Sequence, residues 1–356
     1  KHLGSIMIAV AVSINVSTAV RVRNGHGGLS SRKGLQHLER GEGIAHELVA
    51  TLGAEEAGAC GAAQRVLMQL VPLPAGKTLF EPLLALLDQA QSESCSAALE
   101  VLARHHALSK LTNLDKLVMD CFTAGSTTVQ ASALKVLAKF EPLTIANHAA
   151  ALAAHLGSEE WGLPSQVADV LCKLEPDTLA EHQPALIKSV EHAEWAVRTA
   201  ALRVLGILPP ASLEEAAPQI IEAALKDADA TVRDEALEVL AKVPPRALNQ
   251  HAPLLASSVN HELPSVRKAA MQGLAELEPS ALEPYGKALV ARLADDDKDV
   301  GSAACRAFAR LPRMSRVALA PRVAAHLTHR DKDVRSIALE ACDSLDHAAL
   351  DTDNTK

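Results

Sequence analysis

The chain has 356 residues, of which 48% are hydrophobic but only 2% aromatic, and its formal net charge is −8. Residues 1–38 carry five basic groups and no acid, so the other 318 residues carry 30 basic and 43 acidic groups, a net charge of −13. Nucleic-acid affinity depends on clustered lysine and arginine, so this composition argues against a nucleic-acid partner. The core is expected to consist of alanine, leucine and valine.

The six cysteines show no Cys-x-x-Cys spacing, which argues against a zinc site. They are Cys60, Cys95, Cys121, Cys172, Cys305 and Cys342. Cys305 and Cys342 take positions where other parts of the chain have leucine or methionine, which is typical of small core residues. We therefore expect an intracellular, reducing compartment.

Residues 1–43 differ from the rest of the chain. An uncharged, largely apolar run at residues 3–20 is followed by Arg21, Arg23 and a Gly/Ser-rich stretch. Three interpretations stay open: the remnant of a targeting sequence for an organelle such as a mitochondrion or plastid, an extended arm that binds a partner, or a weak membrane anchor. In the second interpretation, Arg21 and Arg23 are candidate partner-binding residues.

The remainder of the chain, residues 44–347, repeats with a period near 34 residues. A Val-Leu pair followed five residues later by proline recurs at Val136, Val170, Val204 and Val239. The dipeptide Val-Arg recurs in a second phase, which places arginines at Arg198, Arg233, Arg267 and Arg335. A fixed period of 20 to 50 residues is typical of stacked supersecondary units. Extending the phase in both directions gives about nine units, followed by a polar tail at residues 348–356.

Each unit contains two stretches with the spacing of amphipathic helices. In one unit, Val232, Ala236, Val239 and Leu240 form an apolar stripe, and Ile220 begins the stretch before it. A polar turn separates the two stretches. The sequence therefore predicts an all-α fold, a right-handed α-solenoid of about nine helix pairs.

Proline and acidic residues recur in the same register. Pro184, Pro253 and Pro321 each precede a valine by 13 residues, and Pro218 precedes Val232 by 14. Acidic turns recur at Asp227/Asp229, Asp297/Asp299 and Asp331/Asp333. These motifs resemble tandem HEAT and HEAT-like repeats, the superfamily that includes phosphatase scaffold subunits and phycobilin-lyase-type repeats. The resemblance implies a scaffold that binds proteins along a concave face formed by the second helices.

The repeated arginines have a structural interpretation. Arg198, Arg233, Arg267 and Arg335 are expected to form a ladder of ion pairs between adjacent units, with the acidic turns as partners. Lysine and arginine also close several second helices, where cations complement the helix dipole. They are Arg104, Lys139, Lys173, Lys242 and Arg310.

The fifteen histidines invite a metal hypothesis, but His192, His261 and His329 share one repeat position. Neighbouring units lie about one helix spacing apart, too far for two such side chains to share a metal. The iron-binding deoxyhypusine hydroxylases, built from similar repeats, carry four His-Glu pairs, whereas this chain has two, at residues 46–47 and 261–262. We therefore expect no metal, no cofactor and no catalytic residue.

Trp161 and Trp195 lie 34 residues apart at equivalent turns and are candidate partner-binding residues. Packing against the next unit is the alternative. The sequence as a whole predicts a non-catalytic scaffold or assembly subunit that binds protein partners within a larger complex. Two alternatives remain, an enzyme or lyase acting on a chromophore or modified residue, and an organelle subunit tethered to a membrane through residues 3–20.

Overall fold

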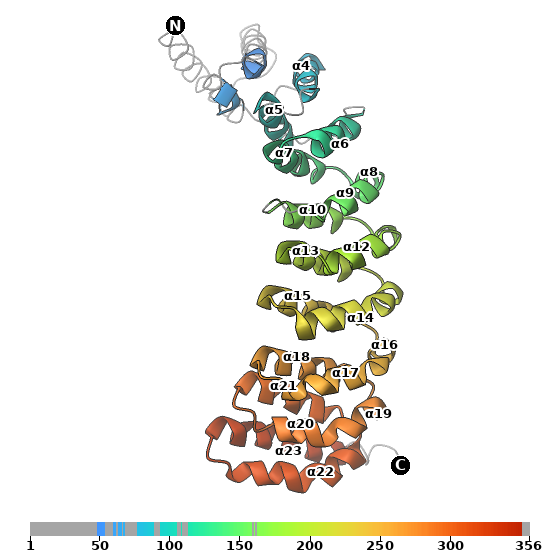
Figure 1. Cartoon of the computed structure of the whole chain (residues 1–356), viewed down its shortest axis with the longest axis vertical. Coiled ribbons are helices and arrows are strands. Elements are labelled where there is room, and N and C mark those ends of the chain that lie inside the picture. The colour runs from blue at the N-terminus through green and yellow to red at the C-terminus, as the bar shows by residue number, and fades with distance from the viewer. Residues whose placement is uncertain are drawn as a thin grey trace, which may run out of the picture. The chain divides into compact units, whose positions relative to one another are not determined.

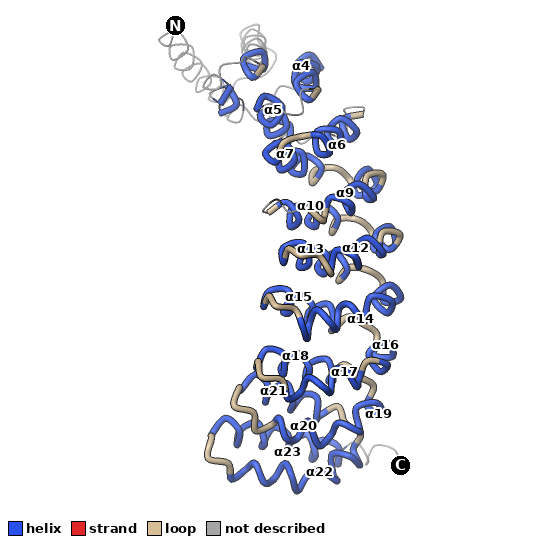
Figure 2. The backbone as a smooth tube through the Cα atoms, viewed as in Figure 1, coloured by secondary structure: helices blue, strands red, loops and turns tan. Residues whose placement is uncertain are grey.

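The computed structural model describes residues 48–53, 60–61, 63–65, 67, 77–88, 93–104, 108, 113–158, 160 and 162–350. Every regular element in these ranges is a helix (Figures 1 and 2). The predicted all-α solenoid is confirmed. The predicted arm at residues 1–43, with Arg21 and Arg23, lies outside the described residues, and so does Trp161.

The chain divides into two compact units. The N-terminal unit comprises residues Lys1–Leu152 and Asp169–Leu174, and the C-terminal unit comprises Ala153–Ala168 and Glu175–Lys356. The helices of the N-terminal unit are α4 (Lys77–Leu87), α5 (Glu93–Ala103), α6 (Leu114–Ala124), α7 (Thr127–Leu137) and α8 (Pro142–Ala146). Helices α9 (Ala149–His155) and α10 (Leu163–Leu171) contribute residues to both units.

The C-terminal unit stacks five helix pairs. The second helices are α13 (Trp195–Leu205), α15 (Ala230–Leu240), α18 (Pro264–Ala275), α21 (Lys298–Ala309) and α23 (Lys332–Leu350). The first helix of each pair is often divided into segments. In chain order, the first helices are α11 (Pro176–Ala180) plus α12 (Gln183–Val190); the single helix α14 (Pro210–Lys226); and α16 (Pro245–Gln250) plus α17 (Ala252–Ser257) and the 3-10 turn η2 (Ser258–Asn260). The last two are α19 (Pro279–Leu282) plus η3 (Glu283–Tyr285) and α20 (Gly286–Arg292), and α22 (Arg313–Ala325) plus η4 (His326–Thr328). Figure 1 shows α13, α15 and α18 on one side of this unit and α12, α14 and α17 on the other. The last helix continues three residues past the predicted end of the array at residue 347.

Alanine sets the spacing of the second helices. Four residues after the valine that begins each apolar stripe, the C-terminal unit has a fully buried alanine. The members of this set are Ala201, Ala236, Ala270, Ala304 and Ala338. Each second helix contacts the next in the series α13, α15, α18, α21 and α23. A methyl side chain at the contact allows helices to approach closely, which explains a hydrophobic core with few aromatic residues.

The repeated prolines occupy two different helical environments. Pro184 and Pro253 lie in the first turn of α12 and α17, where the missing N–H removes no helical hydrogen bond, and the first helix is divided there into two segments. Pro218 and Pro321 lie inside α14 and α22, which continue through the proline. The proline pattern therefore marks the start of a helix in some repeats and the interior of a longer helix in others.

Gly273 in α18 lies in close contact with its neighbouring helices and gives a test of the packing. A Cβ atom at this position would lie 2.6 Å from Leu255 Cδ2 and 3.2 Å from Leu240 Cδ2. We expect Gly273→Ala to lower the free energy of unfolding by about 1–3 kcal/mol through overpacking, measured by urea denaturation.

Gly157 provides the matched control, because the nearest atom to a Cβ there is Ala154 O at 4.0 Å. Gly157→Ala should leave the stability unchanged or raise it by about 0.4–1 kcal/mol, since alanine restricts the unfolded chain. Equal effects of the two substitutions would contradict this account of the packing.

Candidate functional site

The turn between the two helices of each repeat is built around one position. It lies six residues before the ladder arginine and is referred to here as the turn residue. In successive repeats of the C-terminal unit, histidine and aspartate alternate at this position: His192, Asp227, His261, Asp295 and His329. In every case the side chain accepts the backbone N–H two residues later, through Nδ1 of histidine at 3.1–3.2 Å or Oδ1 of aspartate at 2.9–3.0 Å. Histidine and aspartate are therefore interchangeable for closing the turn.

The ladder arginines bind the same turn from the second helix. Nη1 of each arginine donates to the carbonyl oxygens five and six residues earlier, the latter belonging to the turn residue, at 2.7–3.1 Å. The arginines that make this contact are Arg198, Arg233, Arg267 and Arg335. Gly301 occupies the equivalent position in α21.

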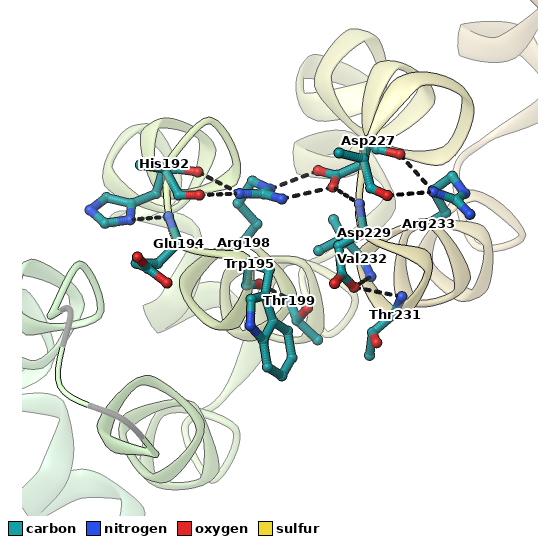
Figure 3. Close-up of polar contacts among 12 residues, drawn as sticks. His192, Glu194, Trp195, Arg198, Thr199, Asp227, Asp229, Thr231, Val232 and Arg233 are labelled. Atoms are coloured by element: carbon teal, nitrogen blue, oxygen red, sulfur yellow. Dashed lines mark hydrogen bonds and ion pairs between the residues drawn. The ribbon is translucent and has the colours of Figure 1, made fainter.

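Two of these arginines also bind the turn of the next repeat. Arg198 donates through Nε and Nη2 to the two carboxylate oxygens of Asp227, both at 2.7 Å (Figure 3). Arg267 binds Asp295 in the same bidentate way, at 2.9 and 2.7 Å. Asp295 also accepts from Arg292 Nη1 at 2.9 Å. A planar guanidinium facing a carboxylate is among the stronger ion-pair geometries in proteins.

Arg233 has a different partner because the next turn residue is His261. His261 has no carboxylate, and its Nδ1 already accepts the backbone N–H of Leu263. Arg233 Nη2 donates instead to Ser265 Oγ at 3.2 Å. The Arg233 residue is only 8% exposed, and its Nε has no hydrogen-bond partner in the described part of the chain. The ladder therefore has ion pairs at Arg198 and Arg267 and neutral acceptors at Arg233.

The structure aligns the acidic turns of successive repeats differently from the alignment that the sequence predicts. Asp297 and Asp331 do not correspond to Asp227, because the structural equivalents of that turn residue are Asp295 and His329. Asp297 is instead the N-cap of α21 and accepts from the backbone N–H groups of Asp299 and Val300. Local charge composition could not distinguish two neighbouring acidic positions with different functions.

The ion pairs change the acid–base properties of their members. Burial raises the pKa of Asp295, but the hydrogen bonds from Arg267, the backbone N–H of Asp297 and the Arg292 guanidinium outweigh it, so the pKa lies below its ordinary value. The hydrogen bond to Asp227 raises the pKa of Arg198, against the opposing effect of burial. The Asp295 carboxylate and the Arg198 guanidinium therefore remain charged at neutral pH.

A second set of cations links the C-terminal ends of adjacent second helices. In the C-terminal unit, Lys242 Nζ donates to Gly206 O at 2.9 Å and Arg310 Nη2 donates to Leu277 O at 3.3 Å. In the N-terminal unit, Lys173 Nζ donates to Ala138 O. Each carbonyl lies at the end of the preceding second helix, where backbone acceptors lack helical partners. These cations therefore have a structural role.

The exposed face of the second helices carries one charged or polar side chain per repeat, a feature that we did not recognise in the sequence. The equivalent residues, referred to as the charged row, are Glu100, Lys135 and Asp169 in the N-terminal unit and Arg203, Glu238, Gln272, Arg306 and Glu340 in the C-terminal unit. Neighbours can pair, as Lys135 Nζ and Glu100 Oε1 do at 3.0 Å. The sign alternates along each unit except at Gln272. The 34-residue spacing alone could have revealed this row.

The charged row crosses a groove of about 740 Å³ in the C-terminal unit. The groove is formed by α15, α18 and α21. Its walls include Asp234, Glu238, Lys268, Gln272, Arg306 and Arg310.

The candidate partner-binding tryptophan in the described part of the chain is Trp195, at the first position of α13. Trp195 is 43% exposed. Figure 3 shows its indole directed away from the Arg198–Asp227 contact. It therefore lies at the edge of the repeat and takes no part in the ladder.

The structure also locates the cysteines and shows what the described residues lack. The six cysteines all lie in the described part of the chain, where none forms a disulfide bond, and four of them, including Cys95 and Cys121, are buried. The Sγ atoms of Cys95 and Cys121 are 3.7 Å apart. Within the described residues no group of three or more His, Cys, Asp or Glu side chains is arranged to hold a metal ion. No helix in that part of the chain has the length and apolarity needed to cross a membrane.

The comparison with known families fits this geometry. Residues 149–241 match the family model described as HEAT repeats. The match spans α9 to α15 and so includes the Arg198–Asp227 contact. No curated protein sequence matches the chain.

Two solved structures have the same solenoid fold. An engineered protein solved by the Northeast Structural Genomics Consortium is similar with a TM-score of 0.54 and 19% identity, over 93% of this chain and 99% of that one. Kap121p, in a crystal structure bound to Pho4p, is similar with a TM-score of 0.66 and 14% identity, over 95% of this chain and 40% of Kap121p. At these identities the likeness concerns the fold alone.

The arginine ladder predicts a pH-dependent loss of stability at Asp295, whose side chain is 1% exposed. A carboxyl with a lowered folded-state pKa adds stability that is present above its unfolded pKa of about 3.9 and is lost as pH falls through the folded value. We expect Asp295→Asn to lower the free energy of unfolding by about 3 kcal/mol at pH 7. The difference from the unsubstituted protein should shrink below about pH 4.

Urea denaturation over a pH series measures this difference. Asp296→Asn is the matched control, because Asp296 is exposed and has no hydrogen bond or ion pair in the described part of the chain. That variant should differ little from the unsubstituted protein at pH 7. Parallel stability curves for Asp295→Asn and the unsubstituted protein from pH 7 to pH 3 would show that the carboxylate is not coupled to folding.

Proposed function

We propose that the protein is a non-catalytic scaffold or assembly subunit that binds protein partners on the exposed face of its second helices. The observation that carries this proposal is the charged row. The ladder arginines and the helix-end cations make contacts within the array, whereas exposed members of the charged row such as Glu238, Arg306 and Glu340 make no hydrogen bond or ion pair in the described part of the chain. Charged groups left unpaired on one face favour specific, electrostatically guided association.

The fold supports the same function. Stacked repeats present an extended surface to which each repeat contributes equivalent positions, and such surfaces suit recognition of another polypeptide better than enclosure of a small molecule. The solved structure of Kap121p bound to Pho4p is one protein of this fold in complex with another protein. Two further candidate contacts accompany the face: Trp195 at the edge of α13 and the arm at residues 1–43.

Site-specific photo-cross-linking tests the proposed face directly. The cross-linking amino acid p-benzoylphenylalanine replaces Arg306 or Glu340 on the second helices, or Glu214 on the first helix α14, and each full-length variant is irradiated in an extract of the source organism. All three positions are exposed. We expect the same cross-linked protein from positions 306 and 340 and none of it from position 214. Equal cross-linking from all three positions, or none from positions 306 and 340, would contradict the proposal.

The two accessory contacts are tested in the same assay. Deleting residues 1–43 should reduce the yield of the cross-linked partner if the arm contributes to binding. Trp195→Ala should reduce the yield without changing the melting temperature, because aromatic side chains at interfaces commonly contribute more than 1 kcal/mol. A lower melting temperature for Trp195→Ala would instead assign the side chain to packing between repeats.

A further inference from the structure

The groove formed by α15, α18 and α21 has walls of opposite charge. On α15, Asp234 and Glu238 line one wall, and on α21, Arg306 lines the other. None of these three side chains makes a hydrogen bond or ion pair in the described part of the chain. The other charges of the groove are already paired: Lys268 Nζ lies 3.1 Å from Asp299 Oδ2, and Arg310 Nη1 lies 3.8 Å from Glu276 Oε2.

Gln272 separates the two unpaired walls. At this point the charged row has an amide in place of an ion, and the two charged groups that α18 and its C-cap bring to the groove, Lys268 and Glu276, are already paired with Asp299 and Arg310. Gln272 Oε1 is buried and has no hydrogen-bond partner in the described residues. An amide side chain offers both donors and acceptors, the complement of a peptide backbone. A backbone N–H entering the groove would satisfy this oxygen after a rotation of the amide.

The charge of the acidic wall also acts on a neighbouring carboxyl, Glu235. Burial and then the charge of Glu238 raise the pKa of the neighbouring Glu235, against the opposing effects of Arg203 and Lys242. A cation bound at Glu238 would relieve this repulsion. The floor of the groove is apolar at Leu237 and Ala303 and suits small or aliphatic side chains.

We propose that this groove binds an extended polypeptide segment that carries a basic residue opposite Glu238 and an acidic residue opposite Arg306. The proposal rests on the proposed function, because it names the kind of partner that the face takes. Helices α15 and α21 are two helix spacings apart, roughly 16–20 Å if adjacent axes are 8–10 Å apart. An extended chain advances about 3.3 Å per residue. The two charged residues of the partner are therefore about five or six positions apart, with small or aliphatic residues between them.

Selection from a displayed library of random twelve-residue peptides tests the proposal on the full chain. The winning peptides are expected to share a basic and an acidic residue about five or six positions apart. When they are synthesised and measured singly, their affinity should fall at least about tenfold for Glu238→Lys and for Arg306→Glu, because each substitution places like charges opposite each other. Glu214→Lys is the control, since Glu214 is an exposed acidic residue on the first helix α14, outside both the groove and the proposed binding face.

A charge exchange makes the test specific for the two walls. The double variant Glu238→Lys with Arg306→Glu should bind a winning peptide in which the basic and acidic residues have been exchanged. Two results would overturn the groove as the site. One is that the selected peptides bind the Glu238→Lys and Arg306→Glu variants as tightly as they bind the unsubstituted protein. The other is that the library yields no binding peptide. In either case the cross-linking at positions 306 and 340 remains an independent test of the face, so failure of the groove is distinguishable from failure of the proposed function.

Discussion

The stacking of these repeats depends on an arginine near the start of the second helix. A single helix pair cannot bury its apolar face, so the array is stable only where neighbouring repeats hold a fixed relation to one another. At Arg198 and Arg267 one guanidinium binds the backbone of its own turn and the carboxylate of the next turn. One side chain thereby fixes the helix, the turn before it and the following repeat. Buried alanines then allow the second helices to pack closely behind this contact.

The alternation of histidine and aspartate at the turn residue divides the junctions of the C-terminal unit into two kinds. Both residues close the turn, but only aspartate has a second oxygen for the arginine of the preceding repeat. At the junctions of Asp227 and Asp295 the turn residue forms an ion pair with the arginine of the preceding repeat. The other two junctions lack this ion pair, because Arg233 faces His261 and the repeat before His329 has Gly301 in place of the arginine. In the C-terminal unit the ion-paired junction therefore recurs at every second repeat, although a helix pair recurs at every repeat. In a linear array, local opening is expected to begin at the weaker junctions.

The sequence was sufficient for the fold because hydrophobic periodicity and proline positions report helices directly. It was less informative about the ladder. The common position of His192, His261 and His329 was visible, but its continuation through Asp227 and Asp295 was not, because the equivalence of an imidazole Nδ1 and a carboxylate Oδ1 appears only in the turn geometry. The groove was beyond sequence reasoning for a related reason. Glu238 and Arg306 are 68 residues apart, and only the stacking of α15, α18 and α21 brings them to one groove.

The ladder account is tested most directly by converting a neutral junction into an ion-paired one. His261→Asp keeps an acceptor for the Leu263 N–H and gives Arg233 the carboxylate that Arg198 and Arg267 already have. We predict a rise of about 1–3 kcal/mol in the free energy of unfolding at pH 7. His329→Asp, which faces Gly301 in the preceding repeat, should change it by less than about 0.5 kcal/mol. Equal effects of the two substitutions, or a loss of stability in His261→Asp, would contradict the account.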